Sequence, residues 1–231
     1  MRVVVLLIVA ACGRIDFDPH ARSDAMPGDF GVDGAPCTHT FCDDFDRSSA
    51  PGEPWDNADA TDGGGFSLVD GKLVLSLPTS DSSGFVEKSF TFTTQLTIRF
   101  QITLETADAG AAELDLEQTQ WPAGSGGCDV LGHYFVRDAT VQTNFQETYS
   151  MNCGSNRNHY SPDIVDGLPH DITMNLRTAL IGLEVDGAPV YEQPPVHSPP
   201  AAQVLVRLGG GGRDFNAAWT LRYDNVQIDS Q

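Results

Sequence analysis

Positive charge is scarce in this sequence. Its 231 residues include 13 Lys and Arg against 32 Asp and Glu, which gives a formal net charge of −19. A field of this sign repels phosphate backbones and anionic lipid headgroups, so the composition argues against nucleic-acid binding and against membrane attachment through basic patches. Many exported soluble proteins are acidic in this way, and the charge alone identifies no partner.

Helical periodicity and the short motifs of common enzymes are also missing. No stretch repeats its apolar residues at helical spacing for more than two turns, whereas alternation at a spacing of two is frequent. There is no Gly-x-Ser-x-Gly elbow and no His-Glu-x-x-His motif, and His133, His159, His170 and His197 have no metal-ligand spacing. The 23 Gly and 14 Pro favour turns between short strands, so we predict an all-β protein.

The first twelve residues have the features of an export signal. Arg2 precedes an apolar run over residues 3–11 that is too short to cross a bilayer, and Cys12 follows two alanines. This ending resembles the lipobox of bacterial lipoproteins, in which small residues precede a cysteine that is diacylated. The resemblance implies a lipid anchor on Cys12 and, because Gly13 rather than Asp follows it, attachment to the outer membrane. The alternative is an ordinary secretory signal in which Cys12 is incidental.

A tether and one folded domain are expected after the signal. Residues 13–36 are rich in Asp, Gly, Pro and Ala without any period, and they can bury too little apolar surface to offset the entropy of ordering. We therefore expect a flexible tether over 13–36 and a β-sandwich over 37–231.

The last strand is expected to organise this domain. Trp219, Leu221 and Tyr223 share one face, and Val226 and Ile228 return to that face only if a β-bulge lies at Asp224-Asn225. We expect residues 41–46 to pair with this strand. Further strands are expected at 71–77, 85–92, 95–105, 112–119, 128–137, 143–153, 170–178, 179–186 and 203–208. The four glycines at 209–212 are interpreted as a flexible loop.

Four short motifs carry a resemblance to a known fold. They are Asp43-Asp-Phe-Asp46, Leu68-Val-Asp-Gly-Lys-Leu-Val74, Gly182-Leu-Glu-Val-Asp-Gly-Ala188 and Tyr223-Asp-Asn-Val-Gln-Ile-Asp229. Together they resemble the concanavalin A-like lectin/glucanase jelly roll, including its LamG-like members, over roughly residues 37–231. The resemblance implies two stacked antiparallel sheets.

The remaining four cysteines are expected to form two disulfides, because an exported chain oxidises its thiols. Cys37 and Cys42 are close enough for a local bond, although Cys-His-Cys metal ligation with His39 is an alternative. A hairpin of 128–137 with 143–153, paired so that residue numbers sum to 281, places Cys128 opposite Cys153.

Three carboxylates alternate with leucines at Glu113, Asp115 and Glu117, so a strand places them on one face. This spacing suits a nucleophile, a modulating Asp and an acid/base, with crowded negative charges raising one pKa. It is similar to the Glu-x-Asp-x-Glu strand of laminarinase- and lichenase-type β-glucanases, which implies those three roles in that order. The alternative is a solvated strand face.

Aromatic residues and aspartates supply the other candidate sites. Trp121 is the main candidate for stacking on a sugar, and Trp55, Tyr149 and Tyr160 are lesser ones, although aromatic residues at strand ends also cap cores. Asp44 and Asp224 would meet where the terminal strands pair. Jelly rolls of this type often hold calcium there, so these two residues are a candidate structural calcium site.

Three functions are compatible with these features. The first is a lipid-anchored, extracytoplasmic glycan-binding or surface-interaction module that needs no cofactor and has a polysaccharide partner. The second is a glycoside hydrolase that cleaves a β-glucan-like polysaccharide through Glu113, Asp115 and Glu117. The third is a structural envelope lipoprotein without a sugar site. The segment before Glu113 consists mainly of the small residues Ala, Asp and Gly, which offer little to hold a sugar beside the carboxylates. Binding is therefore favoured over hydrolysis.

Overall fold

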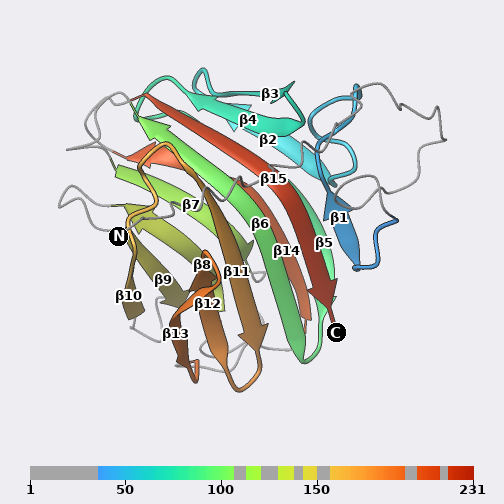
Figure 1. The fold of residues 1–231 in the computed structure, drawn as a ribbon, viewed down its shortest axis with the longest axis vertical. Helices are drawn as coiled ribbons and strands as arrows, with labels where there is room; N and C mark the ends of the chain where they lie inside the picture. Colours follow the sequence, from blue (N-terminus) through green and yellow to red (C-terminus); the bar gives the residue numbers. More distant parts are fainter. Residues whose placement is uncertain are drawn as a thin grey trace, which may run out of the picture.

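The structure is a computed structural model that describes residues 36–106, 113–120, 130–137, 143–149, 157–195, 202–213 and 218–231. These residues form two antiparallel sheets stacked face to face, and they contain no helix (Figure 1). No helix among them is long and apolar enough to cross a membrane. The predicted all-β sandwich is confirmed.

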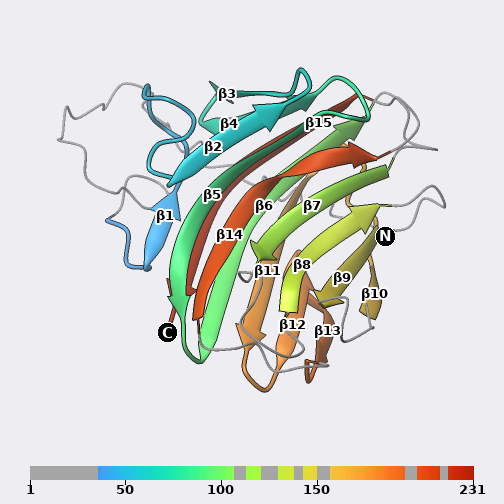
Figure 2. The same ribbon diagram turned by 180° about the vertical axis from the view of Figure 1, so that it is seen from behind.

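One sheet has eight strands and the other has seven. The strands of the eight-stranded sheet are β1 (Phe41–Asp43), β3 (Gly65–Val69), β4 (Lys72–Leu77), β6 (Gln95–Thr106), β11 (Pro169–Arg177), β12 (Ile181–Val185), β13 (Ala188–Gln193) and β15 (Trp219–Ser230). They lie in the order β13-β12-β11-β6-β15-β4-β3, and β1 pairs with β15. The strands of the seven-stranded sheet are β2 (Asn57–Thr61), β5 (Ser83–Phe92), β7 (Glu113–Gln120), β8 (Val130–Arg137), β9 (Thr143–Tyr149), β10 (Arg157–Ser161) and β14 (Ala202–Arg213). They lie in the order β10-β9-β8-β7-β14-β5-β2, in front in Figure 2.

The core lies between the two sheets and follows from alternation along the strands. In β6 the five apolar residues from Leu96 to Leu104 are all buried, while Arg99 and Gln101 between them are partly exposed on the outer face. In β14 the residues Val204, Val206 and Leu208 are buried in the same core. Each sheet therefore has one apolar face toward its partner and one outer face.

The bulge predicted in the last strand is confirmed. The register between β15 and β6 shifts between Asp224 and Gln227, and Asn225 has φ of 54°. The shift returns Val226 and Ile228 to the core, where both are fully buried. The second half of β15 pairs with β1, as expected, and the first half pairs with β4.

The glycines at 209–212 do not form the expected loop; they belong to strand β14, which stays in register with β5 from Ala202 to Gly211. The loop prediction was wrong because glycine is required here by close packing. A Cβ at Gly209 would lie 2.0 Å from the carbonyl oxygen of Gly84. The Tyr223 hydroxyl crosses the core and donates to the Gly209 carbonyl at 2.9 Å. The backbone is therefore held by contacts that a side chain would prevent.

The β8–β9 hairpin has a register one residue away from the expected one. Arg137 pairs with Thr143 and Phe135 with Phe145, so the residue numbers sum to 280 rather than 281. The expected register assumed a turn centred at 140–141, whereas the pairing leaves the five residues 138–142 between the strands. The observed register aligns Phe135 with the buried Phe145, across from Leu116 of β7.

The predicted bond between Cys37 and Cys42 is present, with a Cα–Cα distance of 5.9 Å. Metal ligation through these thiols is thereby excluded. Cys12, Cys128 and Cys153 lie outside the described residues, so the Cys128–Cys153 bond and the acylation of Cys12 stay predictions.

Candidate functional site on the seven-stranded sheet

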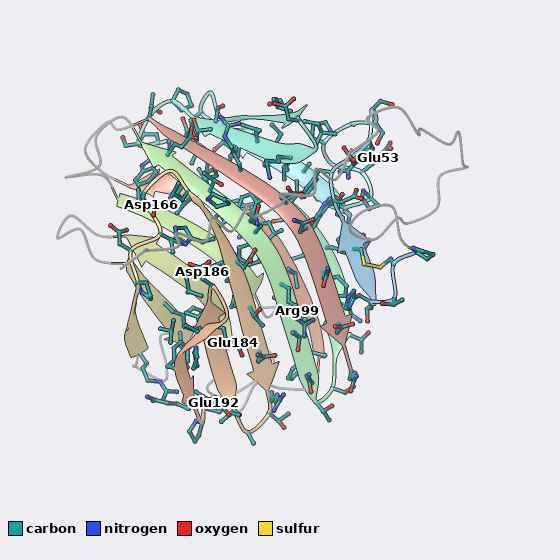
Figure 3. The ribbon with its side chains drawn as sticks, viewed as in Figure 1. Glu53, Arg99, Asp166, Glu184, Asp186 and Glu192 are labelled. Atoms are coloured by element: carbon teal, nitrogen blue, oxygen red, sulfur yellow. A yellow bond between two sulfur atoms is a disulfide. The ribbon has the colours of Figure 1, made fainter. Side chains whose placement is uncertain are left out.

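The outer face of the eight-stranded sheet carries charges that are paired with one another. Arg99, in the middle of this face in Figure 3, lies 3.1 Å from Asp229 on the neighbouring β15, and His39 lies 3.0 Å from the same carboxylate. Burial alone would raise the pKa of Asp229, but hydrogen bonds from His39 and Arg99 outweigh it and lower that pKa. Such an array is typical of a solvated sheet face.

The outer face of the seven-stranded sheet carries a different arrangement around Arg207. The guanidinium of Arg207 on β14 lies over the ring of Phe85 on β5, 4.1 Å from its centroid. Its Nε lies 2.8 Å from Oε1 of Glu87, whose other oxygen accepts a hydrogen bond from Asn57 of β2 at 3.1 Å. We call Arg207, Phe85, Glu87 and Asn57 the Arg207 cluster. It offers an aromatic edge, a fixed guanidinium and an amide on one face.

A strip without side chains adjoins the Arg207 cluster along β14. Gly209 and Gly211 follow Arg207 at alternate positions, and Gly211 pairs with Ser83 of β5 on one side and Asp115 of β7 on the other. A Cβ at Gly211 would find its nearest neighbour at 3.5 Å, an ordinary contact distance. Gly209 is buried, so the accessible bare backbone between the Arg207 cluster and β7 is at Gly211, which is partly exposed.

The acidic strand β7 lies at the centre of the seven-stranded sheet, between β8 and β14. Asp115 pairs with Gly211 and Val136, and Glu117 pairs with Tyr134. Both neighbouring strands shift register against β7 within 115–119. Such irregularities re-aim side chains and are frequent beside functional sites. Their register places Glu113, Asp115 and Glu117 at alternate positions of one strand beside the glycine strip.

The structure brings one predicted aromatic residue into the same cross-strand row as Asp115. The row runs from Ser83 through Gly211, Asp115, Val136 and Asn144 to Tyr160 of β10. With about 4.8 Å between neighbouring strands, Tyr160 lies about 14 Å from Asp115 along this row.

The other aromatic candidates do not join this row. Tyr149 pairs with Val130. Along β9 it follows Phe145 and Glu147 at alternate positions, and both of those residues are buried. Trp121 lies outside the described residues. Trp55 is a core residue, which corrects its interpretation as a sugar platform. Its ring packs edge-on against Phe41 at 5.0 Å, and its Nε1 donates to the buried Asp43 at 2.7 Å.

The candidate calcium residues lie near each other at the expected junction, but Lys72 of β4 forms an ion pair with Asp224 there. The Lys72 ammonium is 2.5 Å from Oδ2 of Asp224. Burial raises the pKa of Asp44, with smaller contributions from the charges of Asp46 and Asp224. In the part of the chain that the structure describes, no group of three or more His, Cys, Asp or Glu could hold a metal ion. No calcium site is therefore evident among the described residues around Asp44 and Asp224.

No local pattern in the sequence indicated the Arg207 cluster. Arg207, Glu87 and Asn57 come from three separate strands, and only the pairing of β14 with β5 and of β5 with β2 brings them together. Alternation in 85–92 and 203–208 does place Phe85, Glu87 and Arg207 on outer faces. The missing information was the long-range register that makes them neighbours.

No protein-family model matches the sequence, and no curated protein is similar to it. Solved structures do share the fold. The marine PL7 alginate lyase AlyA1 from Zobellia galactanivorans is 12% identical with a TM-score of 0.54, over 74% of this chain and 82% of the lyase. The potassium-bound carbohydrate recognition domain of Emp46p is 10% identical with a TM-score of 0.55, over 80% and 94%.

A third neighbour is the kappa-carrageenase from Pseudoalteromonas carrageenovora, in complex with an oligotetrasaccharide of kappa-carrageenan. It is 12% identical with a TM-score of 0.52, over 81% of this chain and 93% of the carrageenase. At these identities the likeness shows the fold alone. The fold is the jelly-roll sandwich of the concanavalin A-like lectin/glucanase type, as the sequence motifs predicted.

Proposed function

We propose that this protein is a lipid-anchored glycan-binding module whose ligand lies across the outer face of the seven-stranded sheet. The Arg207 cluster beside the bare glycine strip is the observation that carries the proposal. A sugar chain needs a flat floor, an apolar edge for its C–H faces and fixed hydrogen-bonding groups for its hydroxyls. Gly211 supplies the floor, Phe85 the edge, and Arg207 with Asn57 the polar groups.

The structural neighbours support this proposal. Their names describe an alginate lyase, a carbohydrate recognition domain and a kappa-carrageenase, and all three share the same jelly roll. The same fold hosts many functions, so the likeness raises the expectation of a glycan ligand without identifying it.

Charge narrows the class of glycan. Alginate and carrageenan, which the neighbours' names mention, are polyanions. On the described outer face Glu87 neutralises Arg207. With a net charge of −19 and the acidic strand β7 at the centre of the sheet, a polyanion would be repelled. We therefore propose a glycan without negative charge.

The lipid anchor is the second part of the proposal. Acylation of Cys12 would hold the domain to the envelope through residues 13–36, which can extend to about 80 Å at about 3.3 Å per residue. That reach would let the sandwich bind a polysaccharide beyond the membrane surface, and Gly13 favours the outer membrane. Mass spectrometry of the mature N-terminus tests this part; an unmodified first residue other than Cys12 would contradict it.

A glycan panel tests the binding part. It should contain neutral β-glucans, chitooligosaccharides, alginate and carrageenan, and wild type should bind a member without negative charge. Arg207→Gln should weaken that binding about tenfold, because one partly buried polar contact with a ligand is worth about 1–2 kcal/mol.

The matched control is Arg99→Gln. Arg99 also forms an ion pair with a carboxylate, but on the outer face of the eight-stranded sheet. The Arg99→Gln variant should leave glycan binding unchanged. Equal losses in both variants would contradict the assignment to the Arg207 face, and binding of no glycan at all would favour a structural envelope role.

Hydrolysis is the second candidate function, favoured by the position and irregularity of β7. The strand is central, and both its neighbours shift register beside Asp115 and Glu117. If the protein is a retaining glycosidase, Glu113 and Glu117 must bring their carboxyls to about 5–5.5 Å. A β-glucan hydrolysis assay tests this. Activity lost in Glu113→Gln but kept in Glu105→Gln, on the other sheet, would establish the enzyme and replace our proposal.

A further inference from the structure

A histidine bound by two carboxylates lies where the loop after β10 enters β11. His170, the second residue of β11, places Nδ1 2.8 Å from Oδ2 of Asp186 and Nε2 3.0 Å from Oδ1 of Asp166. Asp186 belongs to the turn between β12 and β13, and Asp166 belongs to the loop between β10 and β11. Figure 3 labels both aspartates on the same side of the molecule. The imidazole is therefore the middle of a three-residue bridge.

Each carboxylate also accepts a backbone hydrogen bond, Asp166 from its own loop and Asp186 from β11. Oδ1 of Asp166 accepts the Leu168 N–H at 2.8 Å, so Asp166 moves with the loop. Oδ1 of Asp186 accepts the Asp171 N–H at 2.9 Å, so Asp186 is fixed to the start of β11. The loop contact is therefore the one that can open without disturbing the sheet.

The protonation state of the ring decides whether both contacts can exist. Each ring nitrogen needs an N–H to bond an ionised carboxylate, and only the imidazolium has two. The neutral ring directs a lone pair at one carboxylate, which repels it. We propose that His170, Asp166 and Asp186 form a proton-controlled latch, which holds the loop segment of residues 165–168 when His170 is charged and releases it when His170 is neutral.

The surroundings of His170 favour the charged form. Burial alone would lower the pKa of His170, but the hydrogen bonds and charges of Asp186 and Asp166 outweigh it and raise that pKa. The charged groups that face the ring are these two carboxylates, from the turn and from the loop. On the sheet side its strand partner is the apolar Ile102 of β6, and the adjacent Asp171 accepts a hydrogen bond from Gln101.

The sign of the pH dependence follows from the raised pKa. The stability that the latch contributes is fully present below the pKa of His170 in the unfolded chain. It is lost as pH rises through the higher pKa of His170 in the folded protein. Ile164 in the same loop is buried in the core, so opening should be confined to the segment after it.

Hydrogen exchange of the full-length protein tests the proposal. After correction for intrinsic exchange, protection in the peptide covering 165–168 should fall about tenfold between about pH 5.5 and pH 8.5. His170→Gln should remove this pH dependence, since glutamine does not titrate. Asp163→Asn is the matched control, because Asp163 makes a similar turn with the Val165 N–H outside the latch, and it should keep the dependence.

A second measurement uses the wild-type protein, so it does not depend on whether the His170→Gln variant folds. An NMR titration of the wild-type His170 ring should show a midpoint above that of a free histidine, together with shifts of the Leu168 amide at the same midpoint. Protection independent of pH in wild type, or a pH dependence that persists in a folded His170→Gln, would overturn the latch.

Discussion

Substitution of the glycines in β14 tests whether residues 209–212 form a strand or a flexible loop. A methyl group at position 209 would lie 2.0 Å from the Gly84 carbonyl oxygen and 2.8 Å from the Phe85 Cα, both backbone atoms that cannot rotate away. Gly209 also has φ of 155°, which L-residues rarely adopt. Gly209→Ala must therefore push β5 and β14 apart.

The magnitude follows from these two causes. Overpacking against a well-packed core costs about 1–3 kcal/mol, and an unfavourable φ costs about 1–3 kcal/mol more. We expect Gly209→Ala to lose about 3–5 kcal/mol of the free energy of unfolding, a large part of the roughly 5–15 kcal/mol of a typical domain. Gly211→Ala, two residues away, meets its nearest atom at 3.5 Å and should change stability by less than about 1 kcal/mol.

Equilibrium denaturation in guanidinium chloride, followed by the fluorescence of the buried Trp55 and Trp219, measures both variants. With a slope of about 5 kcal/mol per molar, the midpoint of Gly209→Ala should move down by about 0.6–1 M. A loop in this region would tolerate both substitutions. Equal midpoints for Gly209→Ala and Gly211→Ala would therefore refute the packing argument.

Three further predictions concern the N-terminal part and the cysteines. Trp55→Phe should cost about 1–3 kcal/mol in the same denaturation assay, since it removes the indole donor to the buried Asp43; an unchanged midpoint would show that this hydrogen bond contributes nothing. Chelation by EDTA should leave the melting temperature unchanged, because Lys72 already supplies the positive charge beside Asp224; a drop of several degrees would establish calcium. A non-reducing peptide map should link Cys128 to Cys153, and fragments that leave either as a free thiol would contradict the second disulfide.

Strands that bury one face were predictable from the sequence, because their alternation is strict. β6 and β15 are examples, and even the bulge at Asp224-Asn225 could be inferred from the change of phase of Val226. The edge strands β2 and β10 were missed. Asn57–Thr61 is almost wholly exposed and Arg157–Ser161 is largely polar, so neither carries an apolar period.

Register and close approach between strands were harder to predict. The β8–β9 pairing was wrong by one residue because the number of residues in the turn cannot be read from alternation. The glycines of β14 were taken for a loop because the reason for them, the backbone of Gly84, is more than 100 residues away in the chain. The same kind of long-range pairing creates the Arg207 cluster, which explains why no local motif indicated it.

The central claim is that a glycan lies over the seven-stranded sheet beside Arg207. Hydrogen exchange with and without a saturating glycan from the panel tests it most directly. We predict increased protection in peptides from β5, β7 and β14, and no change in peptides from β6 and β11 on the eight-stranded sheet. Protection confined to the eight-stranded sheet, or none in β14, would contradict the claim.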